Sequence, residues 1–209
     1  MTKKLSILFL FVLLFSFFSL SSKEKYKIGF SQCTTGDDWR KSMHREMMIE
    51  LAFFPDFELV IKDANDNSDQ QINDIRQLLD EKIDLLIVSP NESEPITPIV
   101  EEVYNSGIPV IVIDRQIASE AYTAYIGANN YLIGKEAGDY AVKLLNGKGK
   151  IVEITGLQGS SPAINRHNGF MEVISQYPDI ELVASESGKW NYSDSKTVMQ
   201  NFLDQKLNF

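Results

Sequence analysis

The fold is constrained most strongly by short runs rich in valine, isoleucine and leucine. Each run is followed by a segment whose apolar residues have helical spacing. Four such runs occupy residues 26–31, 57–61, 83–88 and 108–113. Largely continuous apolar runs of this length are typical of parallel strands, because crossover helices cover both faces of a parallel sheet. The segments between them are long enough for right-handed crossovers. The sequence therefore predicts an α/β fold with a doubly wound parallel sheet over residues 25–126.

The intervening segments carry apolar residues three and four positions apart, which predicts helices at 39–54, 68–82 and 96–105. Ser68 is expected to cap the second of these helices. The same alternation then restarts. It predicts strands at 124–128, 150–155 and 180–185, and helices at 131–145, 163–177 and 194–203.

A second doubly wound lobe thus begins after the first, but with few strands. A sheet this narrow leaves an edge and a helix face uncovered. We therefore expect the chain to be the N-terminal piece of a two-lobed protein, with lobe I over residues 23–127 and a truncated lobe II over residues 128–209.

The first residues have the character of a processing segment. Lys3 and Lys4 precede an apolar run over residues 5–20, and small residues follow at 19–22. This order predicts a cleaved secretory signal peptide at residues 1–22. The alternative is a membrane anchor, for which the run is short, since a span needs about 20 apolar residues. The protein is therefore expected in the periplasm.

Composition excludes several classes of function. A net charge of −9 argues against nucleic acid as a partner. Cys33 is the single cysteine, so no intrachain disulfide can form, and we expect it to fill a small apolar space at a strand end. His44 is expected to face solvent, and neither His44 nor His167 has a partner at metal-ligand spacing. We therefore assign no metal and no cofactor.

The residues at the predicted strand ends indicate a ligand site. Asp114 and Arg115 directly follow a buried-looking strand, where open α/β sheets bind ligands. Aspartate accepts hydrogen bonds from hydroxyl groups, arginine donates several in one plane, and tryptophan stacks on the C–H face of a sugar. The candidate ligand-binding residues are Trp39, Arg40, Asp114, Arg115, Asn129, Arg166 and Trp190. This set favours a small-molecule sugar as ligand.

Several segments together resemble type I periplasmic binding proteins of the ribose/galactose-binding family. They are residues 108–115, 125–130, 134–140, 156–170 and 198–203. The resemblance implies that Asp114 and Arg115 bind sugar hydroxyls from the first lobe and Arg166 from the second. It also implies that Trp190 stacks on the sugar and that Asn129 lies near a hinge crossing. The loop before Trp39 departs from the ribose type.

Such proteins serve either as the receptor of an ABC importer, which meets a membrane permease, or as the input domain of a fused sensor kinase. A different class remains open. It is an exported α/β hydrolase acting on a small sugar derivative, with Asp114 as nucleophile or base. A DNA-binding repressor of the same fold is disfavoured, because an apolar segment stands where a helix-turn-helix would lie.

Overall fold

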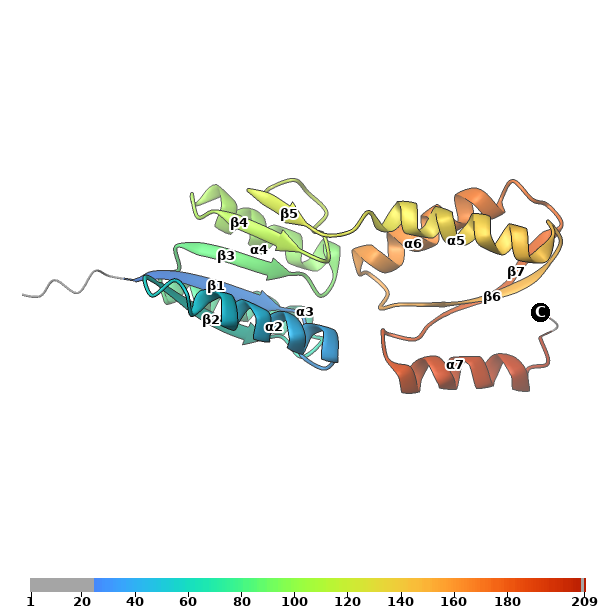
Figure 1. The fold of residues 1–209 in the computed structure, drawn as a ribbon, viewed down its shortest axis with the longest axis horizontal. Coiled ribbons are helices and arrows are strands. Elements are labelled where there is room, and N and C mark those ends of the chain that lie inside the picture. The colour runs from blue at the N-terminus through green and yellow to red at the C-terminus, as the bar shows by residue number, and fades with distance from the viewer. Residues whose placement is uncertain (1–24, 208) are drawn as a thin grey trace, which may run out of the picture.

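The computed structural model describes residues 25–207 and 209. The predicted signal peptide therefore lies outside the described residues. Within the described part, no helix is both long and apolar enough to cross a membrane. We call residues 26–126 the N-terminal half and residues 130–204 the C-terminal half, because each contains one sheet (Figure 1).

The N-terminal half is a doubly wound parallel sheet, as predicted. Its strands are β1 (Tyr26–Gln32), β2 (Phe57–Asp63), β3 (Leu85–Ser89), β4 (Val110–Ile113) and β5 (Ala124–Ile126). Its helices are α2 (Asp38–Leu51), α3 (Ser68–Asp80) and α4 (Ser93–Asn105). The strand order is β2-β1-β3-β4-β5, and every pair is parallel. In this order, ligands bind beyond the carboxyl ends of the strands.

The apolar core lies between this sheet and helices α3 and α4. Leu86 and Val88 of β3 pack there against Ile75 of α3 and Val100 of α4, and all four are fully buried. Helix α2 covers the opposite face, where the His44 ring meets Phe30 of β1 edge-on at 5.2 Å between ring centres. The two faces are thus covered by different helices (Figure 1), which explains why the strand sequences lack a polar face.

The start of α3 differs from the prediction by one residue. Asn67, not Ser68, is the N-cap, and its side-chain oxygen accepts a hydrogen bond from the backbone N–H of Gln70. Ser68 is the first helical residue and donates its hydroxyl hydrogen to Glu92. Both residue types are good caps, so local sequence does not decide between neighbours.

The C-terminal half repeats the strand–helix alternation on a narrower sheet. It contains α5 (Asn130–Leu145), β6 (Gly149–Thr155), α6 (Ser161–Ile174), β7 (Ile180–Ser187) and α7 (Tyr192–Asp204). The described residues of this sheet form two parallel strands, β6 and β7. Helices α5 and α6 lie on one face of this pair and α7 on the other (Figure 1). The predicted domain boundary at residue 127 stays a prediction.

Candidate functional site

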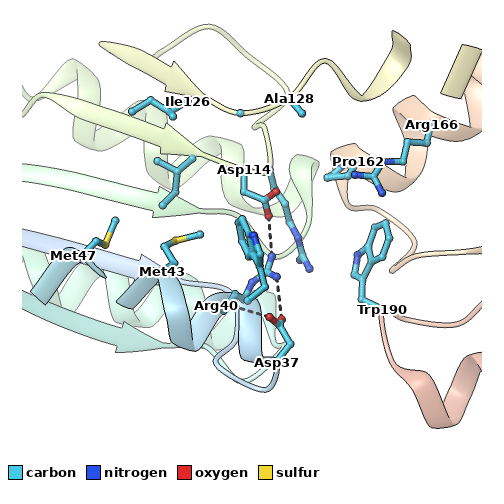
Figure 2. A pocket seen from close by; sticks show the side chains of 14 residues that line it. Asp37, Arg40, Met43, Met47, Asp114, Ile126, Ala128, Pro162, Arg166 and Trp190 are labelled. Atoms are coloured by element: carbon cyan, nitrogen blue, oxygen red, sulfur yellow. Dashed lines mark hydrogen bonds and ion pairs between the residues drawn. The ribbon is translucent and has the colours of Figure 1, made fainter. Parts of the chain in front are cut away.

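A pocket of about 840 Å³ lies where the two halves face each other. On the N-terminal side it is bounded by the carboxyl ends of β4 and β5 and by the start of α2. On the other side are α6 and the turn after β7 (Figure 2). The residues that line it are Asp37, Trp39, Arg40, Met43, Met47, Ile113, Asp114, Arg115, Ile126, Gly127, Ala128, Pro162, Arg166 and Trp190.

Arg40 is the anchored cation of the N-terminal half. Asp37 caps α2 by accepting from the Arg40 backbone N–H at 2.8 Å, and its other oxygen accepts from Arg40 Nη1 at 3.1 Å. Arg40 Nη2 donates to Asp114 at 2.9 Å, and Nε donates to Cys33 Sγ at 3.1 Å. Three of the five side-chain N–H groups of arginine are thereby used. Two remain for a ligand.

The environment of Arg40 fixes its charge. Burial by itself lowers the pKa of this guanidinium, but the contacts with Cys33, Asp114 and Asp37 outweigh that effect and raise the pKa above its usual value. Cys33 is fully buried, as expected, but its sulfur accepts a hydrogen bond from Arg40. Cys33 thus fills a buried space at the strand end and also contacts a charged side chain there.

Asp114 is held in an unusual backbone conformation. Its φ is 61°, and it is the central residue of a three-residue turn in which the Arg115 N–H donates to the Ile113 carbonyl at 2.7 Å. Such turns are rare and strained, and strain of this kind is concentrated at functional sites. The Tyr125 hydroxyl donates to the Asp114 carbonyl at 2.9 Å. Burial and the charge of Asp114 raise the pKa of Tyr125, so this donor keeps its proton.

Arg115 is the most buried cation of the pocket, with 2% of its surface exposed. Its Nη1 donates to the backbone carbonyl of Asn91 at 2.8 Å. Burial is the main cause that lowers the pKa of Arg115, and the charge of Arg40 adds to it. No carboxylate contacts Arg115 within the described residues, so it can offer its remaining hydrogens to a neutral acceptor.

The C-terminal half contributes a second arginine–tryptophan pair. Arg166 on α6 is exposed, its Nε donates to Asn130 Oδ1 at 2.8 Å, and its guanidinium lies 5.5 Å from the ring centre of Trp190. Trp190 lies in the turn after β7 and packs on Gly156 so closely that a Cβ there would be 2.0 Å from the indole. A side chain at position 156 would therefore displace the ring.

The structure brings six of the seven predicted site residues to this pocket: Trp39, Arg40, Asp114, Arg115, Arg166 and Trp190. It places Asn129 elsewhere. This residue is exposed and caps α5 by accepting a hydrogen bond from the Leu132 N–H at 3.1 Å. Whether the six residues bind a ligand stays a prediction.

Sequence reasoning missed several lining residues. The most informative is Asp37, which is both the cap of α2 and an ion-pair partner of Arg40. An aspartate directly before a helical segment is a recognisable cap signal, but its second role depends on the fold. Met43 and Met47 of α2 also line the pocket.

The two histidines take structural positions. His44 is half-buried against Phe30, not solvent-facing, and its Nε2 lies 3.4 Å from the amide nitrogen of Gln32. His167 contacts Glu153 at 2.8 Å. No group of three residues able to hold a metal ion occurs among the described residues.

Fold and pocket together define a class of two-lobed binding domains. The periplasmic binding protein domain family matches residues 28–208, so the chain belongs to this family. The chain is 32% identical over 185 residues to the galactofuranose-binding protein YtfQ of Escherichia coli (strain K12). This match covers 87% of the chain and 58% of YtfQ. The chain therefore spans less than two thirds of this relative.

Comparison with solved structures also finds periplasmic binding domains. The fructose-binding periplasmic domain of the hybrid two-component system BT1754 superimposes with a TM-score of 0.81 at 46% identity, covering 86% of this chain and 60% of that one. An ABC transporter solute-binding protein from Bacillus halodurans C-125, with bound myo-inositol, superimposes with a TM-score of 0.83 at 27% identity. That match covers 90% of this chain and 66% of the other.

Proposed function

We propose that this chain is the sugar-binding part of an exported protein and that one monosaccharide binds in the pocket between its halves. The main support for the proposal is that each half contributes an arginine next to a tryptophan. Arg40 lies 5.3 Å from the ring centre of Trp39 in one half, and Arg166 lies 5.5 Å from that of Trp190 in the other. Indole faces suit the C–H surfaces of a sugar, and guanidinium and carboxylate groups suit its hydroxyl edges.

The charge pattern of the pocket supports a neutral, polyhydroxylated ring as ligand. Both carboxylates of the pocket, Asp37 and Asp114, are already ion-paired with Arg40. The free hydrogens of Arg40, Arg115 and Arg166 therefore point to neutral oxygen acceptors distributed around a small ring. The ligands of the similar proteins, which are galactofuranose, fructose and myo-inositol, are compounds of this kind.

Binding without catalysis is the second part of the proposal. A hydrolase of the class considered above needs a carboxylate free to attack or to transfer a proton. Among the described residues that line the pocket, the carboxylates are Asp37 and Asp114, and Arg40 holds both. The pairing holds an oxygen of each carboxylate on a guanidinium nitrogen, which restricts the approach of that carboxylate to a substrate. It therefore supports recognition over turnover.

The third part concerns location and role. We place the binding domain in the periplasm, consistent with its family and with the predicted signal peptide. We favour the input domain of a sensor kinase, because the fructose-binding domain of a hybrid two-component system is 46% identical. In that role, closure of the halves on the sugar is the signal. The receptor of an ABC importer, with a permease as partner, is the alternative.

Isothermal titration calorimetry with D-fructose, D-galactose, L-arabinose, D-ribose and myo-inositol tests the proposal. We expect one or more of these to bind, and Arg115→Ala to weaken that binding by well over tenfold. Removing one partner of a buried charged hydrogen bond costs about 2–5 kcal/mol. Arg45→Ala is the control, because Arg45 is exposed on α2 and pairs with its neighbour Glu46. Unchanged affinity for Arg115→Ala would remove this residue from the site.

A turnover assay separates the alternative class. The chain is incubated with glycosides and sugar phosphates, and product formation is compared with that of Asp114→Asn. We expect no product from either protein. Turnover that disappears in Asp114→Asn would establish an enzyme instead of a binding protein.

A further inference from the structure

Gln116 is a point of contact between the two halves, and it directly follows Arg115. Its backbone N–H donates to Ser161 Oγ at 2.6 Å, and its side-chain oxygen accepts from Asn165 Nδ2 at 3.3 Å. Both partners belong to α6 of the C-terminal half. Its backbone carbonyl accepts from Ser93 Oγ at 2.8 Å, which fixes Gln116 to α4 of its own half.

A second contact completes the junction. The backbone N–H of Ser93 donates across the halves to the Gly159 carbonyl at 2.9 Å. Gly159 has φ +82°, a backbone conformation that disfavours any other residue, and a Cβ at this position would also displace the Glu92 carboxylate, 2.8 Å away. Ser93 and Ser161 are 8% and 6% exposed. These hydrogen bonds are thus shielded from water, and an unpaired group here would carry a desolvation cost.

The junction connects the immediate neighbours of two pocket arginines. Gln116 follows Arg115, and its partner Asn165 precedes Arg166. Each arginine is also fixed within its own half, Arg115 on the Asn91 carbonyl and Arg166 on the Asn130 side chain. The Arg115 guanidinium therefore moves little by itself, and the hydrogen bond to Asn130 orients that of Arg166. The separation of the two depends on how the halves are placed.

We propose that Gln116 is a positioning residue, which holds Arg115 and Arg166 at the separation where both bind the same ligand. The proposal rests on the sugar-binding function proposed above and deepens it. Gln116 contacts α6 through backbone and side chain, so closure of the halves and alignment of the two arginines occur in one step. Contacts that stabilise the closed arrangement reduce the ordering cost that sugar binding must overcome, which increases affinity.

Ser161→Ala is the main test variant, and Ser160→Ala is its matched control. Both remove one hydroxyl from neighbouring buried positions. The Ser161 hydroxyl accepts from Gln116 in the other half, whereas the Ser160 hydroxyl donates to Leu157 in its own loop. We expect Ser161→Ala to weaken sugar affinity about tenfold, as loss of one shielded hydrogen bond implies. Ser160→Ala should leave the affinity within about twofold.

A distance measurement provides a readout that a purely structural role would not change. Spin labels on Glu102→Cys in α4 and Lys143→Cys in α5 report the separation of the halves by pulsed electron resonance. Both positions are exposed, and the native Cys33 is buried. Without sugar, we expect Ser161→Ala to broaden the distance distribution relative to the parent and to Ser160→Ala. An unchanged distribution in Ser161→Ala would overturn the proposal.

The side-chain contact gives an independent test in case Ser161→Ala does not fold. Gln116→Ala, Asn165→Ala and the double variant form a cycle, and each single variant should weaken the binding of the panel sugars about threefold. The double variant should be no weaker than either single one, because both remove the same contact. Additive losses would overturn the pairing.

Two kinds of failure can be told apart. If the parent binds no sugar of the panel, the proposed function is rejected. If the parent binds but the variants show unchanged affinity and distances, only the role of Gln116 is rejected.

Discussion

The two halves of the chain share an architecture but bury their strands to different extents. In the N-terminal half, Leu86, Val88, Val110 and Val112 are fully buried. In the C-terminal half, most residues of β6 and β7 are only partly buried, and Ile180 is the one buried position of the two strands. The comparison teaches that an α/β sequence pattern does not by itself produce a closed core. The two described strands β6 and β7 form a sheet too narrow to bury the helices that lie on its two faces.

The same contrast holds for the site. Arg40 and Arg115, from the N-terminal half, are 7% and 2% exposed and are held by several partners. Arg166, from the C-terminal half, is exposed and makes one hydrogen bond within the described residues. One side of the pocket is thus part of a folded core, and the other side is a surface. Three measurements can sharpen or break this comparison.

The largest effect is expected from a matched pair of leucine substitutions. Leu86→Ala in β3 removes a fully buried side chain and should lower the free energy of unfolding by about 2–5 kcal/mol. Leu182→Ala in β7 removes a partly buried one and should cost about 1 kcal/mol or less. Urea denaturation followed by circular dichroism measures both. Equal losses would show that the halves share one cooperative core.

An intermediate effect is expected from the two arginines. Arg40→Met leaves Asp37 and Asp114 without their cation, and because both acids are partly exposed we expect a loss of about 2–3 kcal/mol of stability. Arg166→Met leaves no carboxylate unpaired among the described residues, but it removes the hydrogen bond to the buried Asn130 side chain and should cost about 1 kcal/mol. Thermal and urea unfolding measure the difference. A comparable loss for Arg166→Met would contradict the assignment of this arginine to a surface.

The smallest effect is a pH dependence from His44 in the N-terminal half. Burial is the main cause that lowers its pKa below the usual 6.5, the Arg40 charge adds to this, and the Asp63 charge opposes it. The folded state therefore favours neutral His44. The stability that neutral His44 contributes is fully present above pH 6.5, where the unfolded histidine is also neutral. This stability is lost as the pH falls through the lowered pKa of His44.

Urea unfolding of the parent and of His44→Gln at pH 7.5 and at pH 5 checks this expectation. The parent should lose more stability on acidification than the variant does. Identical pH dependence in both proteins would mean that His44 does not titrate differently in the folded and unfolded states.

Most of the fold could be predicted from the sequence, because buried parallel strands and amphipathic helices have distinct apolar periods. The element boundaries agree within a few residues, even for the short strand β5. The cap of α3 was wrong by one position, since Asn67 and Ser68 are both competent caps. The setting of His44 was also wrong, because its burial depends on Phe30 of a strand that the helical pattern does not contain.

The candidate site was predictable only in part. Residues at strand ends gather at one edge of a parallel sheet, so Arg40, Asp114 and Arg115 could be grouped without knowledge of the structure. Their mutual contacts could not. The pairing of Arg40 with Asp114 joins residues 74 positions apart, and the anchoring of Arg115 on the Asn91 carbonyl involves the backbone. Asn129 shows the reverse case, since it follows a strand but its side chain caps a helix.

The exposed placement of Trp190 has an evolutionary consequence. The ring is 42% exposed and stands on a short turn in the half with little buried core. Mutations at this turn can accumulate without unfolding the protein, because surface changes cost little stability. Arg40 and Arg115 of the other half are buried and held by several partners, so substitutions there are tolerated less. Under the proposed sugar-binding function, divergence in ligand preference is therefore expected to begin at the turn after β7, while the opposite wall of the pocket stays constant.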